Sequence, residues 1–264
     1  MHRLVFRTLL AILALAAAAQ ADDWSKTYEL TGKPELRVAA WDADVRIDTW
    51  DQNKIEVHVT THGWHIGSGG LEIVEHQQGN AVEIELRRRH HAHVSFSVET
   101  RGAEMEIHMP RSAKADVKNQ DGGITVHGLA GELAFDSSDG KIELTEVDGS
   151  LRIHTSDGPV RASGRFDAID LHSSDGHVEL DARPGSQLKQ PWEIWTSDGS
   201  VKLSVPGDMA ADVELHTSDG RITTNIPIEV EGRFDKSDVR GKMNGGGNRL
   251  TVHTSDGSIT LDKA

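Results

Sequence analysis

The chain has 264 residues, no cysteine and a formal net charge of −14. The lack of cysteine excludes a disulfide framework, and the large acidic excess makes nucleic acid and anionic membrane surfaces poor partners. Aromatic residues make up only 5% of the chain, which favours a thin, stacked core over a thick globular one.

The first 21 residues have the pattern of a secretory signal peptide. Arg3 and Arg7 give a basic start, residues 9–19 are an apolar run too short to span a bilayer comfortably, and Ala19-Gln20-Ala21 is a typical cleavage site. Removing this segment leaves 243 of the 264 residues and changes the formal charge from −14 to −16. No later segment has the length and apolar character of a membrane span. We therefore expect an exported protein, either periplasmic or extracellular at the cell surface.

Residues 22–112 are predicted to form an N-terminal β section that contains the first coils, irregular strands and a capping part. Apolar residues alternate on both sides of Asp42, and another alternating strand begins near Lys54. From about Gly63 to Pro110 the regular spacing is lost. Terminal repeats need an atypical cover, so we interpret this stretch as part of the same sheet stack. Further strands are expected over residues 71–74, 81–86, 93–98 and 105–109.

From residue 113 to residue 264 one motif recurs: an alternating apolar run, a tight Asp-Gly turn and a second alternating run. The first three intervals between turns are 18 residues each, and the later ones are 23, 21 and 37. A fixed period in this range is typical of repeat architectures. The turn residues are Asp121, Asp139, Asp157, Asp175, Asp198, Asp219 and Asp256.

The apolar positions of the motif lie six and four residues before each turn Asp and three and five after it, with Thr224 as the one exception. A spacing of two is the strand period, and a register that recurs at constant intervals favours stacked coils over hairpins. We predict an all-β fold: a single-chain parallel β-solenoid, β-helix-like, with coils of about 18 residues. Each coil should stack on the preceding one. Ser237-Asp238 is interpreted as a degenerate turn that divides the longest interval.

The residues around each turn carry further predictions. The Gly after each Asp permits a positive φ at the corner, and Asp can hydrogen-bond its own backbone there. The Ser, Thr or Asn two positions before the Asp should face inward, where its polar group must be hydrogen-bonded. Trp192 should face the core and Trp195 the solvent, because alternate residues of a strand point to opposite faces.

Three features together resemble a known family. They are the unit apolar-x-apolar-x-Thr-Ser-Asp-Gly-x-apolar-x-apolar, the early Thr49-Trp50-Asp51, and the strand-Pro junctions Met109-Pro110 and Val205-Pro206. They resemble the bacterial putative-adhesin family of β-strand-repeat proteins, a domain of unknown function, over residues 30–262. The resemblance implies an exported β-strand-repeat protein with adhesion as its named role. It supplies no catalytic residue.

The turn acids and the neighbouring histidines form a candidate metal site. If the coils stack, Asp139, Asp157 and Asp175 lie about 4.8 Å apart, the spacing of neighbouring strands. His154 and His172 would then be direct neighbours close to these acids. Carboxylates attract Ca²⁺, and imidazole with carboxylate binds Zn²⁺. The structural alternative is that Asp serves the turn and His is exposed on the sheet, so that no cofactor is needed.

The outer column three positions before the turn Asp is a candidate binding surface, in which Trp195 would offer a platform for stacking on a sugar. The basic run from Arg87 to His93 is another candidate, for an anion or, through His91 and His93, for a metal. Such a run is more often a solvated strand end. The candidate binding residues of the column are His154, His172, Trp195, His216 and His253.

No nucleophile motif, phosphate-binding loop or isolated pair of acids is present in the sequence. We therefore predict a non-enzymatic protein: an adhesin or an envelope structural or binding protein. It would recognise a macromolecule, either an envelope protein or a glycan, through repeated side-chain columns. Two alternatives remain open. One is a carbohydrate-active enzyme on an outer groove, and the other is a metal-binding module that uses the Asp and His columns.

Overall fold

The computed structural model describes residues 22–67, 70–88, 102–230 and 235–264. Within these residues all regular secondary structure is β, and its 21 strands belong to one hydrogen-bonded sheet. The all-β prediction is confirmed. No helix in this part of the chain has the length and hydropathy of a membrane span. The predicted signal peptide and the strand expected over residues 93–98 lie outside the described residues.

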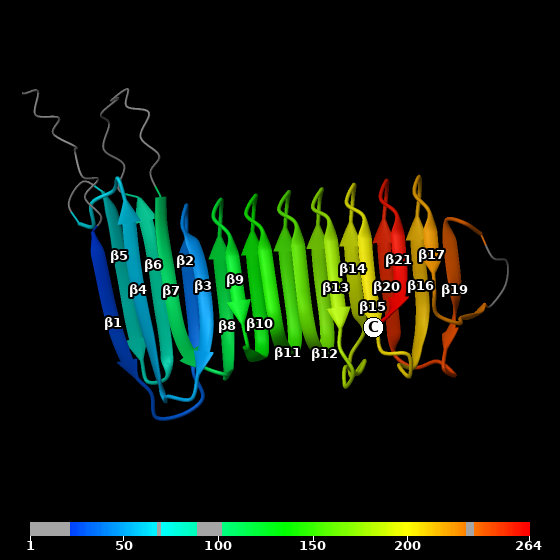
Figure 1. Ribbon diagram of the computed structural model, residues 1–264, viewed down its shortest axis with the longest axis horizontal. Helices are drawn as coiled ribbons and strands as arrows, with labels where there is room; N and C mark the ends of the chain where they lie inside the picture. Colours follow the sequence, from blue (N-terminus) through cyan, green and yellow to red (C-terminus); the bar gives the residue numbers. More distant parts are fainter. Residues whose placement is uncertain (1–21, 68–69, 89–101, 231–234) are drawn as a thin grey trace, which may run out of the picture.

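The sheet is folded into two facing layers that extend along one axis, with the strands running across that axis (Figure 1). Each motif contributes one strand to each layer, and the Asp-Gly turn joins the two strands at the upper corner of the view. We call such a unit a rung. The strands β11 (Ile142–Thr155) and β12 (Val160–Ser173) run through both layers, because each is the second strand of one rung and the first of the next.

Layer 1 contains the strands that precede the turns. Neighbouring strands are parallel from β6 to β16, and antiparallel pairs form both ends. Its order is β5 (Leu71–Gln78), β6 (Ala81–Arg88), β2 (Glu35–Ala40), β8 (Ser112–Asn119), β10 (Ala130–Ser137), β11, β12, β14 (Trp192–Thr196), β20 (Arg249–Thr254), β16 (Ala211–Thr217), β19 (Asp238–Met243) and β18 (Glu229–Val230).

Layer 2 contains the strands that follow the turns. Its strands are parallel from β7 to β17, and antiparallel pairs join β1, β4 and β7 at one end. Its order is β1 (Asp23–Glu29), β4 (Lys54–His62), β7 (Gly102–Pro110), β3 (Asp44–Trp50), β9 (Ile124–His127), β11, β12, β13 (Val178–Ala182), β15 (Val201–Val205), β21 (Ile259–Lys263) and β17 (Ile222–Thr224).

Equivalent apolar residues of neighbouring rungs are register partners, and together they form the core between the layers. Leu133 pairs with Leu151, and Leu151 with Ile169. The core is one cluster that extends from the first described strand to the last. The alternation of buried and exposed residues follows from the strand period, since one face of every strand packs against the other layer. As predicted, Trp192 is fully buried and Trp195 is exposed.

The glycines of the turns are required by close packing and not by their φ angle. The prediction of a positive φ is wrong, because none of these glycines is among the described residues with positive φ. A Cβ added to Gly158 would lie 2.1 Å from the carbonyl oxygen of Gly140, and one added to Gly176 would lie 2.3 Å from that of Gly158. The rungs therefore stack at their normal spacing only where the turn has no side chain after its Asp.

The inward hydroxyl column two positions before each Asp is confirmed. Thr217 and Thr254 are fully buried. The Thr254 hydroxyl donates to the carbonyl of Gly199 at 3.1 Å and accepts from the backbone N–H of Gly257 at 3.1 Å. The hydroxyls of Thr196, Thr217 and Thr254 thus satisfy turn groups of their own rung and of a neighbouring one.

The order of the rungs differs from the prediction that each coil stacks on the preceding one. The rung of β20 and β21 lies between that of β14 and β15 and that of β16 and β17, so Leu250 pairs with both Trp192 and Val213. The predicted turn at Ser237-Asp238 is also wrong, because Asp238 begins β19, which is antiparallel to β16. Val239 follows this Asp, and its side chain would not fit the close-packed glycine column.

Candidate functional site

A line of stacked rings crosses the outer surface of layer 1. The rings of His154 and His172 are 5.1 Å apart and nearly parallel, at 6°. His253 lies 4.7 Å from the ring of Trp195 and 5.0 Å from that of His216. Because His172 and Trp195 are register partners, the two groups form one column. We call it the ring column; in spatial order it contains His154, His172, Trp195, His253 and His216.

Carboxylates contact three of the four histidines of the ring column. The Nδ1 atom of His172 is 3.2 Å from Asp170, and that of His216 is 3.3 Å from Asp238. The Nδ1 atom of His154 is 3.8 Å from Asp136. His253 has no carboxylate contact among the described residues. Burial, and to a smaller extent the neighbouring His216, lowers the pKa of His253.

This arrangement predicts that acid destabilises the rung of His253. Its pKa is lower in the folded protein than in the unfolded chain, so the free energy of unfolding should fall as the pH drops below about 6.5. His253→Gln should weaken this dependence, as measured by urea unfolding at several pH values. His177→Gln, at an exposed histidine outside the column, is the control. An unchanged pH dependence in His253→Gln would contradict the assignment.

The ring column presents mainly ring edges to solvent. The two histidine pairs stack along the long axis, and the Trp195 indole lies against His253 with its ring plane tilted by 37°. Trp195 keeps 38% of its surface exposed. Recognition by this column would therefore use ring edges and their nitrogen atoms more than an open aromatic face.

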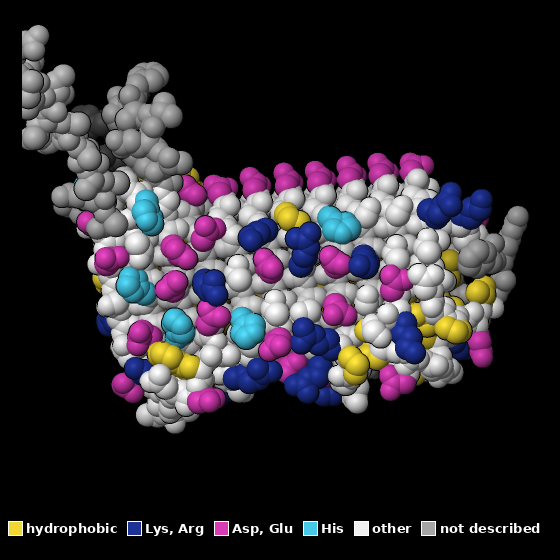
Figure 2. Space-filling view, viewed as in Figure 1, with side chains coloured by type: hydrophobic (Ala, Val, Ile, Leu, Met, Phe, Trp, Pro, Cys, Tyr) yellow, Lys and Arg dark blue, Asp and Glu magenta, His cyan; other side chains and the backbone are white. Residues whose placement is uncertain are grey.

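The turn acids form an exposed row along the upper edge of the molecule, visible in Figure 2 as a line of acidic side chains. None of the carboxylates of the seven predicted turn acids has a hydrogen bond or ion pair with another described residue. Their backbone N–H groups join each turn to the turn of a neighbouring rung. Those of Asp139 and Asp157, for example, donate to the carbonyls of Gln120 and Ser138 on the preceding rung.

Replacing one acid of this row with Asn should stabilise the protein. Asp157→Asn keeps a residue that suits turns and removes the repulsion from the neighbouring carboxylates of Asp139 and Asp175. We expect a higher midpoint of thermal unfolding at low salt, with the gain reduced at high salt because the repulsion is screened. A lower midpoint would indicate that the carboxylate supports the turn.

The predicted metal site does not form a converging set of ligands. Among the described residues no group of three or more His, Asp or Glu side chains could hold a metal ion. The rings of His154 and His172 are parallel, so the lone pairs in their planes do not point to one position.

A groove beside the ring column was not found by sequence reasoning. It is a hollow of about 650 Å³ on the outer surface of layer 1, and it extends over β8, β10, β11, β12 and the start of β14. It exists because small residues replace long ones at outer positions. The signal in the sequence that could have revealed it is a cluster of small residues at outer positions of neighbouring rungs: Ala134, Ser150 and Ala168. Its polar lining includes Lys114, Asp116, Glu132, Arg152, Asp170 and Glu193.

The groove contains carboxylates without partners. Arg152 pairs with Asp170 at 3.2 Å, whereas Glu132 and Glu193 have no hydrogen bond or ion pair with any described residue. One carboxylate oxygen of Asp116 is buried and has no hydrogen-bond partner. Because this oxygen is buried, the acceptors open to a ligand with hydrogen-bond donors are the exposed carboxylates of Glu132 and Glu193.

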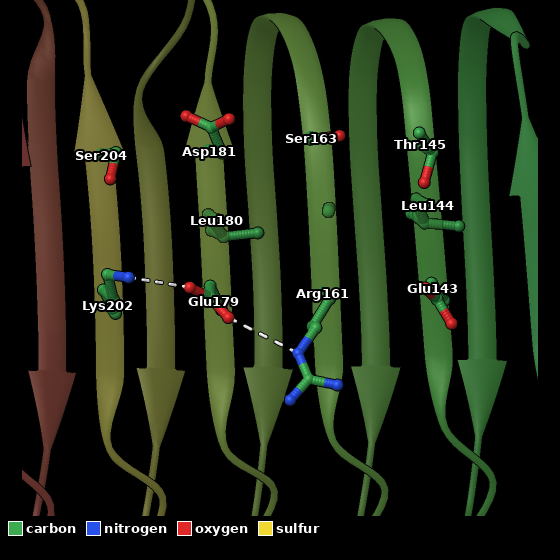
Figure 3. A pocket seen from close by; sticks show the side chains of 11 residues that line it. Glu143, Leu144, Thr145, Arg161, Ser163, Glu179, Leu180, Asp181, Lys202 and Ser204 are labelled. Atoms are coloured by element: carbon green, nitrogen blue, oxygen red, sulfur yellow. Dashed lines mark hydrogen bonds and ion pairs between the residues drawn. The ribbon is translucent and has the colours of Figure 1, made fainter. Parts of the chain in front are cut away.

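A hollow of about 380 Å³ on layer 2 differs from the groove because its charges neutralise one another (Figure 3). Glu179 lies between Lys202, at 2.9 Å, and Arg161, at 3.5 Å. The hydrogen bond from Lys202 holds the pKa of Glu179 below its usual value. This hollow has fewer unpaired groups for a ligand.

Only the start of the basic run, Arg87 and Arg88, lies within the described residues. His91 and His93 lie outside them. Arg87 pairs with Glu72 at 3.1 Å. The guanidinium of Arg88 lies over the rings of Trp64 and Trp41, at 4.8 and 5.5 Å from their centroids. These two arginines thus bind groups of the chain itself.

Stacked parallel strand pairs with side-chain columns on both outer faces define a β-strand-repeat protein. The Toastrack DUF4097 family model matches residues 34–189 and 133–262, so the chain belongs to this family. The resemblance to the putative-adhesin family of unknown function is confirmed. A comparison with curated proteins finds no match.

Several solved structures are similar to this chain. A putative adhesin from Bacteroides fragilis has 10% sequence identity and a TM-score of 0.42, over 92% of this chain and 97% of that one. A putative cell adhesion protein from Clostridium sporogenes has 12% identity and a TM-score of 0.38, over 93% and 100%. A putative lipid binding protein from Parabacteroides distasonis has 12% identity and a TM-score of 0.39, over 93% and 98%.

Proposed function

We propose that this protein is an exported, non-enzymatic binding protein of the adhesin type that holds an extended neutral glycan in the groove of layer 1. Its framework would be a parallel β-solenoid with coils of about 18 residues. The in-register parallel pairs between β8 and β14, together with the 18-residue interval of the turns at Asp121, Asp139, Asp157 and Asp175, support this framework.

The groove carries the proposal because it crosses several rungs and has polar side chains on each of them. A ligand lying along the long axis would meet equivalent positions about 4.8 Å apart, a distance comparable with the length of one sugar unit. Repeated weak contacts add up along such a ligand. The ring edges of His154 and His172 border the groove next to Asp170 and extend the polar surface.

The charges of the groove favour a neutral ligand rich in hydroxyl groups. Of its six charged residues, Lys114 and Arg152 are basic and the other four are acidic. An anionic polymer would be repelled, whereas sugar hydroxyls can donate to the exposed carboxylates of Glu132 and Glu193. The absence of an isolated acid pair in the sequence supports binding without hydrolysis.

The test is binding to a panel of neutral and acidic oligosaccharides, with analysis of the recovered sugars for cleavage. Glu132→Ala and Glu193→Ala should each weaken retention of a bound neutral glycan about tenfold, which corresponds to about 1.4 kcal/mol. Glu143→Ala on layer 2 is the matched control and should bind normally. Cleaved products, or an equal loss in the control variant, would contradict the proposal.

A further inference from the structure

The rung formed by β20, the turn at Asp256 and β21 lies inside the stack although it follows its neighbours in the chain. We call it the inserted rung, residues 249–263. In layer 1 it pairs with β14 on one side and β16 on the other, and in layer 2 with β15 and β17. Figure 1 shows these two strands, in red, between neighbours coloured yellow and orange. Both edges of both strands are therefore paired.

This order leaves a slot until the inserted rung is in place. The chain forms β14 and β15, continues to β16 and β17, adds β18 and β19 outside β16, and only then returns. Without the inserted rung, two strand edges would be open in each layer. Open edges of this kind readily accept another strand.

The contacts in the slot are ones that any copy of the same rung could make. Thr254 donates to the backbone carbonyls of Ser197 and Gly199, and the N–H of Ser218 donates to the carbonyl of Ser255. A Cβ on Gly257 would lie 2.1 Å from the carbonyl oxygen of Gly199, so the tight fit is also between backbones. The apolar contacts repeat the columns of every other rung.

The connection to the inserted rung contains Gly245 and Gly246, with φ angles of 88° and 85°. Glycine adopts this region of φ freely, so the backbone of the connection can be redirected once the hydrogen bonds from Asn244 and Asn248 to the carbonyls of neighbouring loops are broken. Exchange of an identical element between two molecules is a common route to dimers when a connection can open.

We propose that the slot between β14–β15 and β16–β17 is a docking site for the inserted rung of a second copy of this chain, so that two molecules exchange this rung. The partner is recognised by its backbone ladders and its apolar columns. The slot shares only β14 with the glycan groove, which otherwise lies on the rungs before it.

The position of His253 gives this exchange a dependence on pH. His253 is on the inserted rung, between Trp195 of β14 and His216 of β16. Protonation of His253 would place a positive charge between the Trp195 ring and the His216 ring, whose centroid is 5.0 Å away. Burial lowers the pKa of His253, so its charged form opposes insertion. The charged groups on the strands packed against it are Glu193 of β14 and Asp212 and Glu214 of β16. One strand further out, Asp238 of β19 contacts His216 and Arg240 contacts Glu214.

Exchange can be trapped by a disulfide, because the chain has no cysteine of its own. Thr223 of β17 and Thr260 of β21 are register partners on the outer face of layer 2. The variants Thr223→Cys and Thr260→Cys are purified separately, one with a mass tag, mixed at pH 5 or pH 8, and then oxidised at one common pH. A mixed disulfide forms readily only if the rung of one molecule has entered the slot of the other.

In the matched control pair, the variant Thr125→Cys is used in place of Thr223→Cys. Thr125 is on the same face of layer 2 but in β9, away from the slot. We expect at least about tenfold more mixed disulfide from Thr223→Cys with Thr260→Cys than from the control pair, and faster formation at pH 5. Adding His253→Gln to both variants should remove most of the acceleration.

Refolding the two variants together from urea gives every molecule the opportunity to exchange, even if native opening is slow. A yield of mixed disulfide no higher than that of the Thr125→Cys control, both after native mixing and after joint refolding, would overturn the proposal. Equal rates at pH 5 and pH 8 would overturn the role of His253.

Discussion

Gly158→Ala should destabilise the protein by about 3 kcal/mol or more. The added Cβ would lie 2.1 Å from the carbonyl oxygen of Gly140, a backbone atom that cannot move alone. The carbonyl of Gly158 is itself covered by Gly176 of the next rung, so the turn cannot shift along the axis. The backbone hydrogen bonds of both neighbouring turns would be strained, and urea unfolding would measure the loss.

Gly102→Ala is the matched control for this substitution. A Cβ at this position meets no atom within 4 Å, and Gly102 is not among the residues with positive φ. The free energy of unfolding should change by less than about 0.5 kcal/mol. If Gly158→Ala were tolerated as well as Gly102→Ala, the turns would not be packed as closely as the structure indicates.

Trp192→Ala should destabilise the protein by about 3–5 kcal/mol. Trp192 is fully buried, and its ring meets that of Phe166 edge-on with the centroids 6.3 Å apart. Its register partners are Ile169 and Leu250, so truncation would leave a cavity bordered by three rungs. Thermal or urea unfolding would measure the effect.

Trp195→Ala provides the comparison, because Trp195 is on the same strand but faces outward. With 38% of its surface exposed and one ring face on His253, it should contribute less than about 1.5 kcal/mol. Similar losses for the two variants would contradict the assignment of inner and outer faces. A clear difference would also show that the ring column can be altered without unfolding the core, as tests of binding require.

Much of the local structure was predictable from the residue pattern. Alternation with a period of two placed Trp192 inside and Trp195 outside, because successive side chains of a strand point to opposite faces. The repeated offset from the turn Asp predicted that His154 and His172 would be neighbours, and their rings are stacked. The buried hydroxyl column followed from the requirement that inward polar groups be hydrogen-bonded.

The groove and the role of the turn glycines needed three-dimensional information. The groove depends on which small residues are adjacent across rungs and on which carboxylates have found partners. The residues next to Asp116 in the chain do not show that one of its carboxylate oxygens is buried without a hydrogen-bond partner. The glycine after each turn Asp is explained by a carbonyl of a different rung, as at Gly158 and Gly140, and not by its own φ angle.

The sequence by itself therefore determined that the chain is all β, where the seven Asp-Gly turns occur and which side chains of the repeats face inward. Only the tertiary structure decided the order in which the rungs stack. The physical reason is that parallel pairing requires only matched register and an apolar inner column. Leu250 meets this requirement beside Trp192 as well as Val213 would, so the motif does not specify its neighbour. Strands β18 and β19 occupy the outer edge of β16. The rung of β20 and β21, which follows them in the chain, therefore pairs with the inner edge of β16.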